Sequence, residues 1–206
     1  MASDPVVHLI DDDDGVRQAL AFLLTASGFA VRVHESAAAF LDAIATVQPG
    51  CVITDVRMPG MDGLELQRQL KARRLGLPVI IMTGHGDVPL AVEAMKAGAI
   101  DFLEKPFDDE SLLTAVRIAL DRHARNARRD DEVTTARAKL ASLSARELEV
   151  LDGLVAGQPN KTIAYDLNIS ARTVEVHRAN VMTKMGASSL SELVRMVFVV
   201  RSAPVD

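Results

Sequence analysis

The first 120 residues alternate short apolar runs with longer stretches in which apolar residues recur at helical spacing. Continuous apolar runs are typical of strands that are covered on both faces, and the longer stretches are typical of amphipathic helices. Strands are predicted over residues 6–10, 29–33, 51–54, 79–82 and 100–103, and helices over 16–26, 36–45, 64–71, 88–96 and 111–120. This repeated order predicts an α/β domain with a five-stranded parallel sheet between two layers of helices.

From residue 141 onward the pattern is helical throughout. Ser144 and Glu147 are spaced as a capping box, and this first helix stops at Gly157-Gln158-Pro159. Helices are then predicted over residues 160–166, 171–185 and 189–199, with a tight turn at 167–170. Two helices joined in this way form a helix-turn-helix, in which the second helix enters a DNA major groove. A plain four-helix packing domain is the alternative.

Residues 122–140 separate the two patterns. This stretch contains neither Pro nor Gly, is rich in Ala, Arg, Asp and Glu, and has few apolar residues. We interpret it as a solvated helical linker that continues the helix before it, between a first domain at 1–121 and a second at 141–206. A flexible coil is the alternative.

Charge and composition narrow the classes of protein. The net charge of −5 divides into −7 for residues 1–120, +2 for 121–140 and zero for 141–206, which argues against a nonspecific polycation. The single Cys51 excludes an internal disulfide and is expected to be a small buried side chain. No apolar stretch has the length of a membrane span, and the N-terminus lacks the basic start of a signal peptide. We therefore expect a cytoplasmic protein with no membrane partner.

Polar side chains stand at the ends of four predicted strands. Asp11 and Asp12 follow the first strand, Asp55 the third, Thr83 the fourth and Lys105 the fifth, so all are expected at the ligand-binding edge of the sheet. Clustered carboxylates repel each other unless a cation intervenes, and all-oxygen ligation favours Mg²⁺. A carboxylate beside Mg²⁺ is a suitable nucleophile toward a phosphoryl group. The other phosphoryl oxygens would accept hydrogen bonds from the Thr83 hydroxyl and the Lys105 ammonium.

These residues carry a resemblance to a known family. Ile10-Asp11-Asp12, Thr54-Asp55-Val56-Arg57-Met58-Pro59-Gly60, Thr83-Gly84 and Lys105-Pro106 resemble the receiver domain of two-component response regulators. The resemblance implies a flavodoxin-like (βα)5 fold, a sensor histidine kinase as partner, and phosphorylation at Asp55. It also implies a Mg²⁺ ion held by Asp55, by Asp12 directly, by Asp11 through a water molecule, and by the backbone carbonyl of Arg57.

The same resemblance implies a switch. Thr83 would move toward the phosphate, Phe102 would rotate inward, and the face formed by residues 88–120 would be remodelled and form a homodimer. Phe102 as an ordinary core residue is the competing interpretation. The peptide bond between Lys105 and Pro106 is expected to be cis.

The second domain carries its own resemblance. Leu143-Ser144-Ala145-Arg146-Glu147, Asn160-Lys161-Thr162-Ile163-Ala164 and Ser170-Ala171-Arg172-Thr173-Val174-Glu175-Val176-His177-Arg178 resemble the LuxR/NarL-type helix-turn-helix. It implies that the domain binds double-stranded promoter DNA and that Val174 and Val181 face the core. The candidate DNA contacts are Asn160, Lys161, Thr173, Glu175, Val176, Arg178, Ala179 and Lys184.

Residues 82–96 and 172–182 resemble a particular branch of this family, which activates nitrogen-fixation genes under a haem-containing, oxygen-sensing histidine kinase. That branch implies phosphorylation at low oxygen and RNA polymerase as a further partner. We also expect the acidic first domain to inhibit the DNA-binding module until phosphorylation.

Two other functions would use an aspartate or a helix-turn-helix of this kind. A phosphatase of the haloacid-dehalogenase type needs a second Asp two residues after its nucleophile, and Arg57 stands there. In a constitutive DNA binder the first domain would only pack, which leaves the set Asp12, Asp55, Thr83 and Lys105 unexplained. The sequence therefore favours a response regulator transcription factor that is not a conventional enzyme.

Overall fold

The computed structural model describes residues 4–84 and 88–203. The chain divides into two compact units, residues 1–126 and 127–206. In the described ranges no helix is both long enough and apolar enough to cross a membrane.

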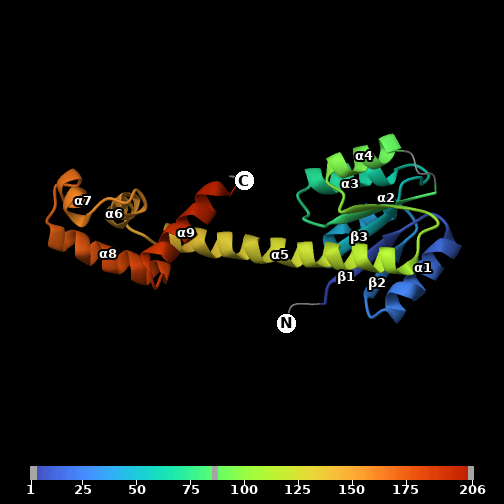
Figure 1. Cartoon of the computed structure of the whole chain (residues 1–206), viewed down its shortest axis with the longest axis horizontal. Coiled ribbons are helices and arrows are strands. Elements are labelled where there is room, and N and C mark those ends of the chain that lie inside the picture. Colours follow the sequence, from blue (N-terminus) through green and yellow to red (C-terminus); the bar gives the residue numbers. More distant parts are fainter. Residues whose placement is uncertain (1–3, 85–87, 204–206) are drawn as a thin grey trace. The chain divides into compact units, whose positions relative to one another are not determined.

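Unit 1 is built on a five-stranded parallel sheet in the order β2-β1-β3-β4-β5 (Figure 1). Its strands are β1 (Val6–Ile10), β2 (Ala30–His34), β3 (Gly50–Asp55), β4 (Val79–Thr83) and β5 (Asp101–Glu104). Its helical elements are α1 (Asp14–Ala26), α2 (Ala37–Asp42), the short 3₁₀ turn η1 (Ile44–Thr46), α3 (Gly63–Ala72), α4 (Val88–Ala97) and α5 (Asp109–Ala141). The predicted parallel α/β fold is confirmed.

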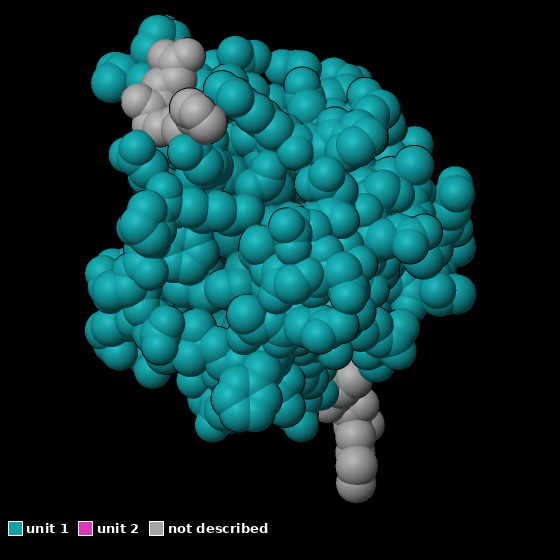
Figure 2. All heavy atoms as spheres, turned by 90° about the vertical axis from the view of Figure 1, so that its right-hand side faces the viewer, with its two compact units in different colours: residues 1–126 teal, residues 127–206 magenta. Residues whose placement is uncertain are grey.

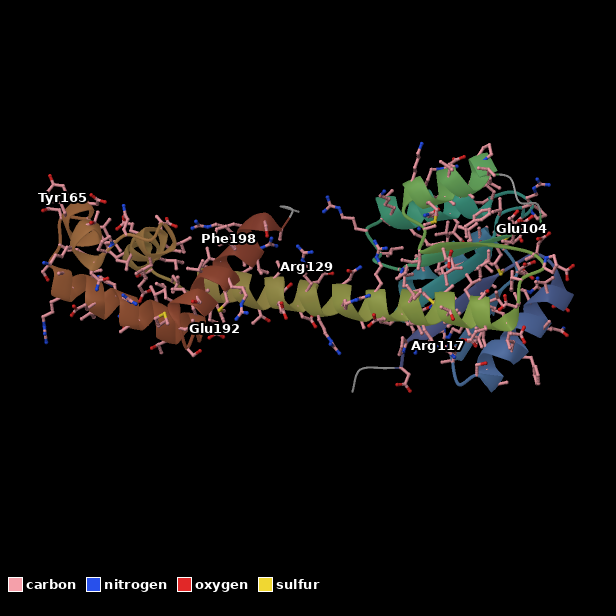
Figure 3. All side chains as sticks on the ribbon, viewed as in Figure 1. Glu104, Arg117, Arg129, Tyr165, Glu192 and Phe198 are labelled. Carbon is pink, nitrogen blue, oxygen red and sulfur yellow. The ribbon has the colours of Figure 1, made fainter. Side chains whose placement is uncertain are left out.

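Helices cover both faces of this sheet (Figure 1). One core lies under α2, α3 and α4 and includes Phe40, Leu66 and Ile81. The other lies under α1 and α5 and includes Leu24 and Leu112. On the face that Figure 2 shows, the atoms of unit 1 pack into a rounded surface.

The strands differ in burial. Every residue of β1, β3 and β4 is buried, as expected for strands covered on both faces. In β2 the prediction of a strand covered on both faces was wrong, because β2 lies at an edge of the sheet and Val33 is 52% exposed. An edge strand has a neighbour on one side only, so its side chains keep more contact with water.

Parallel register aligns the strand ends. Ile10 pairs with Thr54, Asp55 with Met82, and Thr83 with Glu104. Three neighbouring pairs of strands therefore end at the same level. The residues that follow them come together at one edge of the sheet.

Two histidines and the cysteine of unit 1 have pKa values shifted toward the neutral form by burial. His34 Nε2 lies 3.4 Å from His8 Nδ1, and both rings pack against Phe40. Burial lowers the pKa of His8, and burial with the charges of His8 and Arg32 lowers the pKa of His34 to about 4. Cys51 is fully buried as predicted, and burial raises the pKa of its thiol to about 12.

Unit 2 is helical. Its helices are the last part of α5, then α6 (Ala145–Val155), α7 (Asn160–Asp166), α8 (Ala171–Met185) and α9 (Leu190–Ser202). The predicted capping box of Ser144 and Glu147 is present, and Gly186 ends α8 in the left-handed conformation with φ of 64°. Ala136 and Leu140 of α5 are shielded within this unit, with Leu140 packed against its core.

The boundaries of domain and linker at residues 121 and 141 stay predictions. Residues 122–140 lie within α5, which runs from Asp109 to Ala141. The division into compact units falls inside that predicted linker, after residue 126.

Candidate functional site

Asp55 is the last residue of β3, and both of its carboxylate oxygens are held. Oδ1 accepts a hydrogen bond from Lys105 Nζ at 2.7 Å. Oδ2 accepts one from the backbone N–H of Arg57, also at 2.7 Å. Asp55 is 8% exposed, so its carboxylate is fixed in orientation and still reaches the surface.

Lys105 joins Asp55 to Asp11. The Lys105 ammonium also donates to Asp11 Oδ2 at 2.7 Å, and Asp11 is 2% exposed. Burial alone lowers the pKa of Lys105, but hydrogen bonds to Asp11 and Asp55, with their charges, outweigh burial and raise it. The ammonium therefore stays charged and keeps two buried carboxylates together.

Asp12 does not take part in the hydrogen bonds that join Asp11, Lys105 and Asp55. Its side chain is exposed and lines a hollow of about 620 Å³ together with Arg57, Met58 and Leu90. Within residues 4–84 and 88–203, no three His, Cys, Asp or Glu side chains are gathered closely enough to hold a metal ion. The cluster thus consists of Asp11, Asp55 and one cation.

The neighbouring acids Asp13 and Asp14 are structural. Asp13 caps α1, since its Oδ1 accepts from the backbone N–H of Val16 at 3.0 Å. Asp14 lies in the first turn and pairs with Arg17, where its side chain is 70% exposed. Neither side chain joins the cluster around Asp55.

Thr83 and Phe102 lie on β4 and β5. Thr83 is fully buried, and its carbonyl accepts from the backbone N–H of Lys105 at 2.7 Å. Phe102 is half-buried and packs against the core beneath α3 and α4. The peptide bond between Lys105 and Pro106 is cis, as predicted.

In unit 2, α7 and α8 are joined by a short turn that passes through Asn168 with φ of 54°. Val174 and Val181 are fully buried in the core, as predicted. Glu175, Val176 and Ala179 are exposed on α8, and Val176 is 55% exposed. Asn160, Lys161, Glu175 and Arg178 line a common hollow of about 490 Å³.

Two of the candidate DNA contacts make intramolecular hydrogen bonds. The Thr173 hydroxyl lies 2.8 Å from that of Ser170, which caps α8. Lys184 Nζ donates to Glu147 Oε2 at 2.7 Å. For these residues, a contact with DNA would compete with a bond inside the domain.

Comparisons with known proteins match both parts of the chain. Residues 7–117 match the family described as response regulator receiver domain, and residues 141–197 match bacterial regulatory proteins of the luxR family. The transcriptional regulatory protein FixJ of Azorhizobium caulinodans is 62% identical over 200 residues, which cover 97% of this chain and 95% of that protein. The chain is a response regulator of the LuxR family.

Solved structures support the same assignment. The response regulator StyR has 42% sequence identity and a TM-score of 0.83, covering 95% of this chain and 99% of that one. Full-length FixJ from B. japonicum has 50% identity and a TM-score of 0.60, covering 97% and 98%. A response regulator of this type is a transcription factor and not a conventional enzyme.

The receiver domain depends on a residue that the sequence pattern did not single out. Gly63 opens α3, and its N–H donates to the Val56 carbonyl at 3.0 Å. A Cβ atom at Gly63 would lie 2.3 Å from the carbonyl oxygen of Asp55. The pair Asp62-Gly63 before an amphipathic stretch was a usable signal, because Asp62 caps α3.

The ion pair of Glu147 and Lys184 predicts a pH dependence in the DNA-binding domain. Hydrogen bonds from Lys184 and from the backbone N–H of Ser144 lower the pKa of Glu147 from 4.5 to about 2. A lowered pKa contributes stability above the unfolded value, so this contribution is lost as pH falls from about 5 toward 2. We expect Glu147→Gln to lower the melting temperature at pH 7, and this loss to shrink steadily below pH 5.

Thermal unfolding followed by circular dichroism from pH 7 to pH 3 measures this effect. Glu149→Gln is the matched control, because Glu149 makes a more exposed pair with Arg146 on the same helix. An equal effect of the two substitutions at every pH would contradict the prediction.

Proposed function

We propose that Asp55 accepts a phosphoryl group from a sensor histidine kinase. The observation that carries this is the cluster at the sheet edge, where Asp55 is held by Lys105 and by the backbone of Arg57. An Asp55 oxygen forms a bond to phosphorus as the phosphorus–nitrogen bond of the phosphohistidine breaks. The electron pair stays on the histidine nitrogen, which takes up a proton, and Asp55 becomes an acyl phosphate.

Magnesium is proposed as the cofactor. The Asp11 and Asp55 oxygens that share the Lys105 ammonium already converge on one cation, and both are hard ligands. The ion would be held by Asp11, Asp12, Asp55 and the Arg57 carbonyl, with water completing its shell. When bound, Mg²⁺ would neutralise charge on the phosphoryl oxygens.

Acetyl phosphate with Mg²⁺, followed by intact-mass measurement, tests the acceptor. We expect one phosphoryl group on the wild type and none on Asp55→Asn, because an amide oxygen is a poor nucleophile. Asp14→Asn is the control, since this exposed acid lies outside the cluster. Unchanged phosphorylation of Asp55→Asn would overturn the proposal.

We further propose that phosphorylation remodels the face formed by residues 88–120 through Thr83 and Phe102. Thr83 is fully buried at the end of β4, and Phe102 is half-buried on the adjacent strand. Apolar side chains are exposed on this face, namely Val88, Val92, Met95 and Ile118. Covering them in a homodimer would remove apolar surface from water. Sedimentation of the phosphorylated protein tests this, and a persistent monomer would contradict it.

Unit 2 is proposed to place α8 in the major groove of double-stranded promoter DNA. Glu175, Val176 and Ala179 would face the bases, where Glu175 can accept from cytosine N4 and Val176 can pack on a thymine methyl. Asn160, Lys161, Thr173, Arg178 and Lys184 would contact phosphates. The exposed residues and the hollow shared by α7 and α8 support this assignment.

Replacing Lys161 by alanine is expected to weaken binding to every DNA sequence by a similar factor. Loss of one phosphate contact reduces the slope of log affinity against log salt by about 0.9. Fluorescence anisotropy at several salt concentrations measures this slope. Arg201→Ala is the control, because Arg201 lies in the last turn of α9, pairs with Asp152 of α6, and is not a candidate DNA contact. An unchanged slope for Lys161→Ala would contradict the phosphate contact.

The receiver domain is proposed to inhibit DNA binding until it is phosphorylated. Residues 1–120 carry a net charge of −7, which would attract the basic residues of α7 and α8 electrostatically. If an isolated fragment of residues 127–206 binds promoter DNA no better than the unphosphorylated full chain, this idea is wrong.

We also propose that the target promoters are of the nitrogen-fixation type, that RNA polymerase is a partner, and that the protein acts in the cytoplasm. The similarity to the transcriptional regulatory protein FixJ supports the role in transcription. Promoter-reporter assays with and without oxygen test that assignment.

A further inference from the structure

A second cavity lies in the receiver domain, at the opposite edge of the sheet from Asp55. Its volume is about 410 Å³, and it is lined by residues that precede or begin β4 and β5, such as Pro78, Val79 and Ile100. The second half of α3, the end of α4, and Arg122 and Asn126 of α5 complete its walls. All of these residues belong to unit 1, and phosphoryl transfer at Asp55 uses none of them.

The charge of this cavity is opposite to that of the domain around it. Lys71, Arg74 and Arg122 line it, and among the described residues no Asp or Glu does. Lys71 is anchored, since its Nζ donates to the Ala97 carbonyl at 3.2 Å. Three cations line one cavity, although residues 1–120 carry a net charge of −7, and together these cations create a local site for an anion.

Gln67 supplies an independent sign of a ligand. It is 3% exposed, lines the cavity, and donates from Nε2 to the Ala94 carbonyl at 3.2 Å. Its Oε1 is buried and has no hydrogen-bond partner within the described part of the chain. Turning the amide over would bring two acceptors together at Ala94, so Oε1 is left to receive a donor. An unpaired buried acceptor destabilises the folded state, and a hydrogen bond from a ligand N–H or O–H would relieve this.

We propose that this cavity binds a small organic anion that carries both a negative group and a hydrogen-bond donor on an apolar body. The ligand's carboxylate or phosphate would pair with the basic residues of the lining, including Arg122. The ligand's N–H or O–H would donate a hydrogen bond to Gln67 Oε1. Leu70, Leu77 and Val79 supply apolar walls, and the volume lies within the range of small-molecule sites.

Two matched sets of probe compounds separate the anion types. For a carboxylate, 4-hydroxybenzoate is compared with benzoate, which lacks the donor, and with 4-hydroxybenzyl alcohol, which lacks the charge. For a phosphate, adenosine 5′-monophosphate is compared with adenosine. Two-dimensional ¹H–¹⁵N NMR of the full chain reports saturable shifts of the Gln67 side-chain amide and of the backbone amide of Gly76. The complete probes, which carry both the charge and the donor, are 4-hydroxybenzoate and adenosine 5′-monophosphate. We expect at least one of them to cause shifts that saturate as its concentration rises.

Variants assign the contacts. Arg122→Gln is expected to weaken the complete probe about tenfold, since a hydrogen bond to a charged group contributes that much. Arg125→Gln is the matched control, because Arg125 pairs with Asp121 and does not line the cavity. Gln67→Leu should remove the preference for 4-hydroxybenzoate over benzoate.

If Gln67→Leu disturbs folding, Arg122→Gln with its control decides the matter. Three results would overturn the proposal: no saturable shift with either complete probe at millimolar concentration, equal effects of Arg122→Gln and Arg125→Gln, or the same shifts with inorganic phosphate alone. Phosphorylation of Asp55 is measured separately by mass, so failure here is distinguishable from failure of the proposed function.

Discussion

Gly63→Ala is expected to destabilise the receiver domain by about 3 kcal/mol, because the added methyl group overlaps the backbone next to Asp55. Its Cβ would lie 2.3 Å from the Asp55 carbonyl oxygen and 3.1 Å from Thr54 Cγ2. Both neighbours belong to the buried strand β3, so neither can move without shifting the sheet. Relief requires α3 to move away, which also breaks the 3.0 Å bond from Gly63 N–H to the Val56 carbonyl.

The same displacement should impair phosphorylation at Asp55, whose carboxylate depends on the local path of the chain. Hydrogen exchange measured by mass spectrometry locates the destabilisation. Peptides from β3 and α3 should lose protection, while those from α6 to α9 keep it. Gly84→Ala is the control, because a Cβ there meets no atom of the described residues within 4 Å and the backbone is not left-handed. Equal protection in the two variants would contradict the close approach.

Lys105→Met is expected to destabilise the receiver domain by about 2–3 kcal/mol at pH 7 without Mg²⁺. The substitution keeps the apolar stem and removes the only cation that bonds both Asp11 and Asp55 among the described residues. The two carboxylates, 2% and 8% exposed by residue, would then repel each other with little access to water.

The loss should depend on conditions in a definite direction. Magnesium should shrink the variant's deficit relative to wild type, because the ion would replace the Lys105 ammonium between the two carboxylates and stabilise the folded variant more than the wild type.

Urea unfolding at pH 7, with and without Mg²⁺, measures this change. Lys96→Met is the matched control, since Lys96 is exposed on α4 and bonds neither carboxylate. A deficit that does not change with Mg²⁺ would show that Lys105 acts through packing and not through charge.

Much of the molecule was predictable because it follows from local patterns. Apolar runs gave the strands, and the position of polar residues directly after them indicated Asp11, Asp55 and Lys105 as neighbours, since parallel strands end at one edge. Ser144 and Glu147 marked a helix start because a capping box involves only residues three apart. Val174 and Val181 were assigned to the core from a resemblance between whole segments.

Other features depend on which segments become neighbours in space. The exposure of β2 follows from its place at the sheet edge, which the strand pattern does not encode. Lys184 and Glu147 lie on different helices and are 37 residues apart in the sequence, so no local pattern could indicate their pairing. The same holds for Gln67, whose amide donates to the Ala94 carbonyl of α4 and which lines a cavity shared by α3, α4, α5 and the starts of β4 and β5.

The sequence by itself determined the order of the elements, the acidic edge with its phosphoacceptor candidate, and the helix-turn-helix, because periodicity and short-range spacing fix these. Only the tertiary structure decided which carboxylate shares the lysine. It assigns Asp11, and not the exposed Asp12, to the ion pair with Asp55. The physical reason is geometric: adjacent residues leave a strand end in different directions, and only packing determines which side chain is buried against Lys105.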